Sequence, residues 1–243
     1  ELYDACIQVD FDIPFFLEEA QRANGSVLEL MSGSGRVSLP LIEAGVPLTC
    51  VDFSAGLLAI LRRKLDAHGL PAELRHMDVR DLALGRAFDL IFIPFHSFTE
   101  VLALEDERQV LRRVADHLAG TGRFICTLHN PAVRLQAVDR PYGLWLERPL
   151  PGGAGTVLLW GVQQVDAARE IVTVQEFFEV YDPANMMQAR HRVQLQFRLL
   201  APDQFRAMAT EAGFAVEALY GNYDRSDFDP SASPFMIWVL RHA

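Results

Sequence analysis

Residues 27–36 read Val27-Leu-Glu-Leu-Met-Ser-Gly-Ser-Gly-Arg36, and a second apolar run ends at Val51-Asp52. The first run is typical of a strand that ends in a glycine turn, and a helical pattern follows over residues 37–44. Glycine lets the backbone approach a ligand, and the helix begins with unpaired N–H groups. The order predicts a β-α-β unit in which Asp52 accepts hydrogen bonds from both hydroxyls of a ribose. We therefore expect a cofactor that contains adenosine.

Two details of this turn help to separate the candidate cofactors. The dinucleotide fingerprint is Gly-x-Gly-x-x-Gly, but Gly33 and Gly35 are followed by Ser38 where the third glycine would stand. Glu29, two residues before the turn, would repel a pyrophosphate but suits a cationic group, such as the amino group of a methionine moiety. The alternative for Glu29 is a structural role, either pairing with an arginine or capping a backbone N–H.

Composition and charge limit the classes to which the protein can belong. The 243 residues, half of them hydrophobic, fit one α/β domain with an insertion. The net charge of −10, without a Lys/Arg cluster, argues against a nucleic-acid partner. No apolar run approaches the ~20 residues of a transmembrane helix. The start, Glu1-Leu-Tyr-Asp4, does not resemble a signal peptide and lacks an initiator Met.

The three cysteines, Cys6, Cys50 and Cys126, are scattered and form neither a metal-binding spacing nor a disulfide framework. Cys50 and Cys126 lie in apolar runs and are expected to be buried thiols. We predict a cytoplasmic protein, monomeric or homodimeric, that acts on a small molecule without a metal, a membrane or a nucleic acid.

Strands and helices alternate through residue 129. Because several strands are apolar throughout, they predict a parallel sheet that is covered by helices on both faces. Ser54 is the expected N-cap of the helix at 57–67. Strands are expected at 26–30, 48–53, 72–76, 88–94 and, after a glycine turn at 120–122, at 123–129; the other helices are expected at 11–23, 37–44 and 105–118.

The pattern changes after residue 140. Residues 156–165, 171–181 and 189–199 alternate apolar and polar positions with no helix between them, which predicts an antiparallel meander of about three strands. A helix at 202–213 and strands at 214–220 and 235–241 follow. We expect a single domain over 1–243, in which residues 140–200 form a β-rich, substrate-covering insertion.

Ligands of doubly wound sheets bind beyond the carboxyl ends of the strands. Asp78 follows one such end and is expected to accept a hydrogen bond from the exocyclic amine of adenine, with Met77, Val79 and Phe53 flanking the ring. The alternative for Asp78 is a turn cap, in which its side chain bonds a nearby backbone N–H.

Further candidates lie at the same edge and at the amino terminus. His96 and His129 each follow a predicted strand, and an imidazole there can orient or deprotonate a substrate. The alternative for each is a structural or merely exposed side chain. Tyr3 is a candidate lid over the cofactor, and its alternative is a place in a frayed terminus.

These motifs resemble those of the class I S-adenosylmethionine-dependent methyltransferases, whose first motif is commonly Glu-Leu-Gly-Cys-Gly-Thr-Gly-Arg. Residues 51–54, 76–79, 88–98 and 120–124 resemble the later motifs in order, and residues 213–239 resemble the final helix and strand hairpin. Met31 departs from the family pattern, because it stands at the motif's first glycine. A side chain there either narrows the space near the cofactor or changes the turn.

The resemblance implies a seven-stranded, Rossmann-like sheet in the order 3-2-1-4-5-7-6 with the seventh strand antiparallel. It implies transfer of a methyl group from S-adenosylmethionine to a small-molecule acceptor, with His96 and His129 as the candidate catalytic residues. The expected cofactor-binding residues are Tyr3, Glu29, Met31, Ser32, Gly33, Gly35, Asp52, Phe53, Met77, Asp78, Val79 and Phe95.

Two other hypotheses use the same fold. A nicotinamide-dependent oxidoreductase would share the β-α-β unit, and the missing third glycine argues against it. A non-catalytic cofactor- or partner-binding module would also keep the fold, and Met31 is the feature that favours it.

Overall fold

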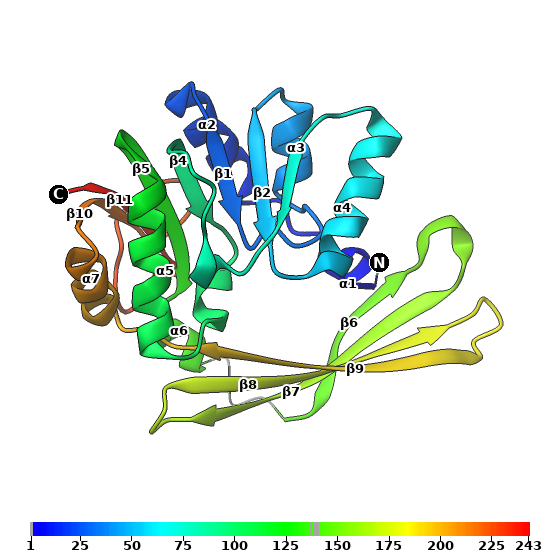
Figure 1. The fold of residues 1–243 in the computed structure, drawn as a ribbon. Coiled ribbons are helices and arrows are strands. Elements are labelled where there is room, and N and C mark those ends of the chain that lie inside the picture. Colours follow the sequence, from blue (N-terminus) through cyan, green and yellow to red (C-terminus); the bar gives the residue numbers. More distant parts are fainter. Residues whose placement is uncertain (1, 137, 139–140) are drawn as a thin grey trace. The chain divides into compact units, whose positions relative to one another are not determined.

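The computed structural model describes residues 2–136, 138 and 141–243 (Figure 1). The chain divides into two compact units. The large unit comprises Asp10–Val133 and Leu200–Ala243, and the small unit comprises Glu1–Val9 and Arg134–Leu199.

The large unit contains a seven-stranded sheet in the order β3-β2-β1-β4-β5-β11-β10. The strands β1 to β5 are parallel, and β11 is antiparallel to both of its neighbours. The predicted strand order and the antiparallel strand are thus confirmed. The bounds are β1 Val27–Leu30, β2 Leu48–Asp52, β3 Glu73–His76, β4 Phe88–Ile93, β5 Leu118–His129, β10 Phe214–Tyr220 and β11 Phe235–His242.

Helices cover both faces of this sheet (Figure 1). On one face, apolar side chains of α2, α3 and α4 pack on the strands, and on the other face those of α5 and α7 do. Burial of apolar surface on both sides explains why the central strands lack polar alternation. The bounds are α2 Ile13–Ala23, α3 Ser38–Glu43, α4 Ala55–His68, α5 Leu104–His117 and α7 Pro202–Glu211, with the 3₁₀ turns η1 Val79–Asp81 and η2 Ser97–Glu100.

Local capping chemistry sets the ends of these helices. Ser54 is the N-cap of α4, as predicted, and its hydroxyl accepts a hydrogen bond from the Leu57 N–H at 3.3 Å. Gly69 ends the same helix in the left-handed conformation, which a residue without a Cβ adopts at little cost. The short helix α6, Pro131–Gln136, spans the sequence boundary between the two units.

The predicted glycine turn before β5 is wrong. Strand β5 already begins at Leu118, where it pairs with Phe88, and the register then shifts so that Leu90 pairs with Arg123. Residues 119–122 therefore form a bulge within the strand. A Cβ on Gly122 would lie 2.9 Å from the Phe88 carbonyl oxygen, so the glycine permits close approach of two strands.

The small unit contains an antiparallel sheet in the order β6-β7-β8-β9. The meander is confirmed, but it has four strands instead of three. The extra strand, β6, escapes a search for alternation because a bulge at Trp145 breaks its pattern. The bounds are α1 Leu2–Cys6, β6 Gly143–Pro149, the 3₁₀ turn η3 Pro151–Gly153, β7 Thr156–Asp166, β8 Ile171–Tyr181 and β9 Met187–Arg198.

The cysteine prediction holds. Cys50 and Cys126 are buried free thiols, and so is Cys6. Among the described residues, no helix is both long enough and apolar enough to cross a bilayer.

Candidate active site

The carboxyl edge of the parallel strands brings most of the predicted site residues together. The turn Met31–Gly35 follows β1, Asp52 ends β2, and Met77 follows β3. Phe95 and His96 follow β4, and His129 ends β5. Because the strands run in parallel, these positions lie along one edge of the large unit's sheet.

The turn after β1 has the backbone form of a glycine-rich loop although its first residue is methionine. Met31 has a φ of 59°, in the same left-handed region as Gly33 at 58° and Gly35 at 84°. Its side chain is partly buried and packs on the core beneath α5 and α7. Met31 therefore adopts the turn that glycine would adopt, at a conformational cost of about 1 kcal/mol.

The two glycines serve different purposes. A Cβ on Gly35 would lie 2.3 Å from the Cδ1 atom of buried Leu61, so the packing of α4 requires a glycine there. A Cβ on Gly33 would meet only the Leu57 Cδ1 atom, at 4.0 Å. The backbone at Gly33 thus borders open space that a ligand can occupy.

Asp52 is held beside this opening. It is only 4% exposed, its Oδ2 accepts a hydrogen bond from the Gly33 N–H at 2.8 Å, and its Oδ1 accepts one from the Ser54 N–H at 2.8 Å. A carboxylate offers about four lone-pair positions. The two backbone bonds fix its orientation and leave acceptor capacity on both oxygens, which suits a pair of ribose hydroxyls.

Glu29 is buried on β1, where its Oε2 accepts a hydrogen bond from the Ser38 hydroxyl at 2.5 Å. Burial raises the pKa of Glu29 to about 8, although the Ser38 bond and the positive charge of Arg36 oppose this shift. The carboxyl is consequently mostly protonated at neutral pH, and a ligand cation placed near it would favour its charged form. The arginine and backbone-cap alternatives are not what the structure shows, because the bond is to a serine.

The predicted adenine-binding residues differ in exposure. Phe53 presents 66% of its surface, whereas Met77 is partly buried and Val79 is 6% exposed. The Met77 N–H donates to the Asp52 carbonyl at 3.0 Å, which ties the end of β3 to the end of β2. An exposed aromatic ring beside a buried carboxylate is a suitable surface for a purine.

Asp78 acts as a cap in this structure. It bonds the backbone N–H of Arg80 at 2.9 Å and the guanidinium of the same residue at 2.6 and 3.0 Å. Arg80 also pairs with Asp106 at 2.9 Å. The hydrogen bond from the Arg80 guanidinium holds the pKa of Asp78 below its usual value. The role of Asp78 toward adenine stays a prediction.

Phe95 and His96 lie on a tight turn after β4, with φ values of 54° and 64°. The Arg36 guanidinium lies 4.4 Å from the centre of the Phe95 ring and makes a bidentate pair with Asp12, with both distances 2.6 Å. The Asp12–Arg36 pair joins residues 24 positions apart and was not predicted from the sequence. Its only local signal is the charged residue directly after the glycine turn.

The two predicted histidines lie against each other. The rings of His96 and His129 are stacked, with centroids 3.8 Å apart and an interplanar angle of 24°. The Phe235 ring of β11 also stacks with the His96 ring, with centroids 5.4 Å apart, and the Thr127 hydroxyl accepts a hydrogen bond from the backbone N–H of His96 at 3.2 Å. Since β4 and β5 are neighbours, residues at their ends could have been paired from the strand order alone.

Tyr3 is the one predicted site residue that belongs to the small unit. The side chain of Tyr3 lies outside the described part of the structure, and its backbone belongs to α1 of the small unit.

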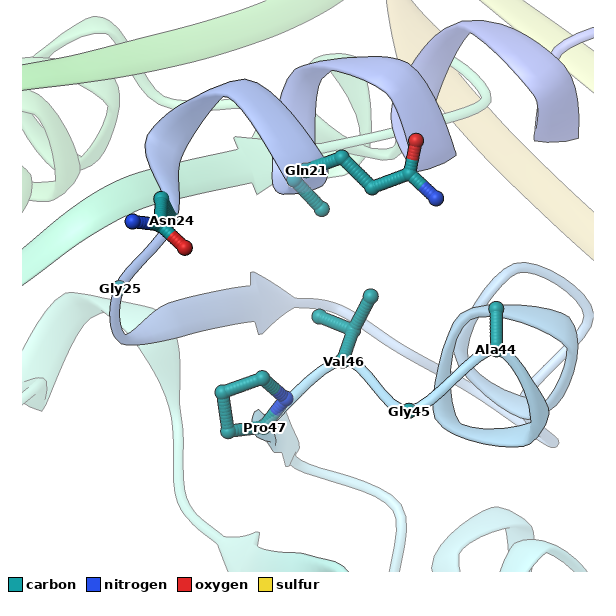
Figure 2. A pocket seen from close by; sticks show the side chains of 8 residues that line it. Gln21, Asn24, Gly25, Ala44, Gly45, Val46 and Pro47 are labelled. Carbon is teal, nitrogen blue, oxygen red and sulfur yellow. The ribbon is translucent and has the colours of Figure 1, made fainter.

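A pocket of the large unit lies away from this site (Figure 2). It is lined by Ala20, Gln21, Asn24 and Gly25 around the end of α2 and by Ala44–Pro47, which precede β2. These positions mark the amino ends of the strands, opposite the glycine turn, so the pocket is not part of the candidate site. Within the described ranges, no group of His, Cys, Asp and Glu has the arrangement of a metal site.

Comparison with known proteins agrees with this geometry. Residues 27–139 match a family model described as a methyltransferase domain. A demethylmenaquinone methyltransferase of Thermus thermophilus is 33% identical over 142 residues, which are 56% of this chain and 61% of the relative. A dTDP-3-amino-3,6-dideoxy-alpha-D-glucopyranose N,N-dimethyltransferase of Streptomyces fradiae is 26% identical over 204 residues, which are 81% of this chain and 72% of the relative.

Solved structures show the same fold over nearly the whole chain. A S-adenosylmethionine-dependent methyltransferase from Clostridium acetobutylicum has a TM-score of 0.85 at 18% identity, covering 100% of this chain and 96% of that one. The CcbJ methyltransferase from Streptomyces caelestis has a TM-score of 0.79 at 22% identity, covering 96% and 90%. The matched regions cover only part of the length of the curated relatives, namely 61%, 51% and 43% of three of these proteins. The matching family model and the structural neighbours are those of S-adenosylmethionine-dependent methyltransferases, and the chain has the fold of this family.

The carboxyl edge fits the S-adenosylmethionine that this family uses. The open backbone at Gly33 admits a ligand, the buried Asp52 carboxylate keeps acceptor capacity, and the exposed Phe53 ring offers an apolar surface beside it. The three features lie at the ends of neighbouring strands, as a ligand with a sugar and a base requires.

Proposed function

We propose that the protein transfers a methyl group from S-adenosylmethionine to an amine nitrogen of a small molecule. The observation that carries the proposal is the pairing of Gly33 with Asp52 at the carboxyl edge of the sheet. The name of the Streptomyces fradiae relative, an N,N-dimethyltransferase of an amino sugar, supports an amine acceptor.

Different residues at this edge bind different parts of the donor. Asp52 accepts the ribose hydroxyls, and the backbone of the turn from Met31 through Ser32 to Gly35 lies along the methionine portion. Glu29 meets the methionine ammonium, which stabilises its charged form although burial alone raises its pKa to about 8. The adenine is flanked by Phe53, Met77, Val79 and Phe95, with Asp78 at its exocyclic amine and Tyr3 as a lid.

The bound cofactor supplies a methyl group that is already activated by its sulfonium. The protein therefore contributes alignment of the acceptor and exclusion of water, and such positioning can lower a barrier by ~7–11 kcal/mol. An amine loses a proton for each methyl group that it gains. His96 or His129 accepts that proton at a ring nitrogen, and their 3.8 Å stack keeps both rings in one place at the end of β4 and β5.

Calorimetry with S-adenosylhomocysteine tests the proposal. We expect binding in the micromolar range or tighter, roughly −8 kcal/mol, and no competition by NADH. Tight NADH binding without a signal for S-adenosylhomocysteine would establish the oxidoreductase alternative. Failure to bind either compound would favour a module that keeps the fold for partner binding.

We also propose that the protein works in the cytoplasm, as a monomer or homodimer and without nucleic acid. The net charge of −10 and three free thiols support this. Light scattering on the purified protein measures the oligomeric state, and retention on a nucleic-acid column would contradict the last point. The small unit is proposed to govern acceptor choice within one methyltransferase domain.

A further inference from the structure

Glu29 is a buried carboxyl group without an ionic partner of its own. It lies on β1 and is 1% exposed, with Cys50 of β2 and Phe92 of β4 as its register partners. Its one hydrogen bond comes from the Ser38 hydroxyl, and in the part of the chain that the structure describes no ion pair engages it. A charged carboxylate in such surroundings is unfavourable unless a cation accompanies it.

The charged groups that act on Glu29 sum to a negative charge. Arg36 follows the glycine turn and would stabilise the carboxylate, but its guanidinium makes the bidentate pair with buried Asp12. Asp52, at the end of the neighbouring strand β2, adds a second negative charge. The Cys50 thiol is neutral at pH 7, because burial raises its pKa. These surroundings favour the protonated form of Glu29 and leave one positive charge to be supplied.

The Ser38 hydroxyl allows Glu29 to change its charge without a rearrangement of the fold. Ser38 is the buried first residue of α3, and its hydroxyl donates to the Glu29 Oε2 atom at 2.5 Å. A hydroxyl can donate to a neutral carboxyl or to a carboxylate, so this bond persists in both states. It is stronger when the acceptor is ionised, and the Ser38 bond accordingly lowers the pKa that burial raises.

The missing positive charge can come from the donor. Under the proposed function, the ammonium of the methionine portion meets Glu29 at the carboxyl edge of the sheet. An ammonium beside a carboxylate forms charge-assisted hydrogen bonds, which stabilise the ionised form. The proton that the carboxyl loses passes to the solvent, and the ammonium–carboxylate pair remains in the site. Every protein residue in this argument belongs to the large unit.

We infer that the donor binds with release of one proton from Glu29, an inference that rests on the proposed function. Glu29 then distinguishes ligands by charge, because an analogue without the ammonium leaves the carboxyl protonated and binds without proton release. Donor affinity falls as the pH falls, since the free protein then holds the proton more firmly. The pKa of about 8 that burial gives to Glu29 sets the upper end of this range.

Calorimetry with S-adenosylhomocysteine measures the release, because the heats of binding in two buffers of different ionisation enthalpy differ in proportion to the protons exchanged. At pH 7 we expect release of about one proton, and between pH 7 and pH 6 a Kd that rises about tenfold. Glu29→Gln should release no proton and keep a nearly constant Kd over this range. Glu43→Gln is the matched control, because Glu43 is an exposed carboxylate of α3, and it should behave as the unsubstituted protein does.

The outcomes distinguish this inference from the proposed function. Equal proton release by Glu29→Gln and the unsubstituted protein, or binding of S-adenosylhomocysteine to the unsubstituted protein without release, would overturn the inference and leave the proposed function standing. Absence of S-adenosylhomocysteine binding at every pH would contradict the proposed function itself, and this inference with it.

A second ligand decides the question if Glu29→Gln does not melt cooperatively. The probe is the analogue of S-adenosylhomocysteine that carries hydrogen in place of its amino group, and it is titrated into the unsubstituted protein. It should bind without proton release and with a Kd that depends little on pH. Proton release equal to that of S-adenosylhomocysteine would overturn the inference, because the ammonium would then not be its cause.

Discussion

At the scale of single residues, Met31 shows how a family pattern can change without a change in the turn. Its left-handed backbone is the conformation that the glycine of the motif would supply, and its side chain packs into the core. The sequence alone left two outcomes open for this position, a narrowed site or an altered turn. The backbone φ value of 59° shows that the turn is kept by accepting local strain.

The strain at Met31 predicts that glycine is more stabilising than alanine at this position. Alanine is normally favoured over glycine, but at a positive φ the order reverses. We expect Met31→Gly to be more stable than Met31→Ala by about 1 kcal/mol, since both lose the methionine packing and only glycine relieves the strain. Urea unfolding of the two variants measures the difference. A more stable alanine variant would show that the turn relaxes out of the left-handed region.

Asp52 is predicted to serve both the ligand and the fold. Asp52→Ala removes two acceptor sites for the ribose, each worth about 1.5–3 kcal/mol, so affinity for S-adenosylhomocysteine should fall at least tenfold. It also removes the bonds to the Gly33 and Ser54 N–H groups, so the free energy of unfolding should fall by about 1–3 kcal/mol. Calorimetry and urea unfolding measure the two effects, with Asp66→Ala on the exposed side of α4 as control. Unchanged affinity would place the ribose elsewhere.

Glu29 predicts a pH dependence of stability. Its pKa is raised from 4.5 to about 8 in the folded protein by burial. The stabilisation from its neutral form is therefore complete below pH 4.5 and is lost as the pH rises towards 8. The Tm of Glu29→Gln, relative to the unsubstituted protein, should rise between pH 5 and pH 8. Glu105→Gln, an exposed carboxylate of α5, is the control and should show a flat difference. A flat difference for Glu29→Gln too would contradict the raised pKa.

At the scale of elements, long-range partners are what the sequence did not reveal. The strand ends and the Ser54 cap follow from local pattern, because they depend on residues a few positions apart. The Asp12–Arg36 pair joins residues 24 positions apart, and the stack of His96 on His129 depends on the β4–β5 neighbourhood. The β5 bulge was missed for the same reason. A glycine is needed at position 122 because the Phe88 carbonyl oxygen lies close to it, and Phe88 is distant from Gly122 in sequence.

The Asp12–Arg36 pair is expected to hold the start of α2 against the turn that precedes α3. Asp12 is fully buried and the Arg36 side chain is 13% exposed. Asp12→Ala removes the bidentate partner of a mostly buried guanidinium and should cost about 3–5 kcal/mol of unfolding free energy. The double variant with Arg36→Met should recover part of that loss, as measured by urea unfolding. Equal losses in the single and double variants would mean that the cost does not come from leaving the Arg36 guanidinium unpaired.

At the scale of the whole molecule, the sheet order followed from the alternation of strands and helices together with the family resemblance. The sequence predicted an insertion over residues 140–200, and the compact small unit comprises Arg134–Leu199 together with Glu1–Val9. The participation of Glu1–Val9 could not be predicted. Residues at the two ends of a unit that is discontinuous in sequence share no local signal, so only the three-dimensional contacts identify it.

The two units are expected to divide the binding of donor and acceptor between them. The large unit holds all seven strands of the parallel-based sheet and the residues Gly33, Asp52 and Phe53. A variant that lacks residues 1–9 and has a short Gly/Ser linker in place of 134–199 should therefore melt cooperatively and keep S-adenosylhomocysteine affinity nearly unchanged in calorimetry. It should lose turnover of any amine acceptor, since acceptor choice is proposed to depend on the small unit. If the variant folds but no longer binds S-adenosylhomocysteine, residues of the small unit belong to the donor site, as a lid role for Tyr3 would require.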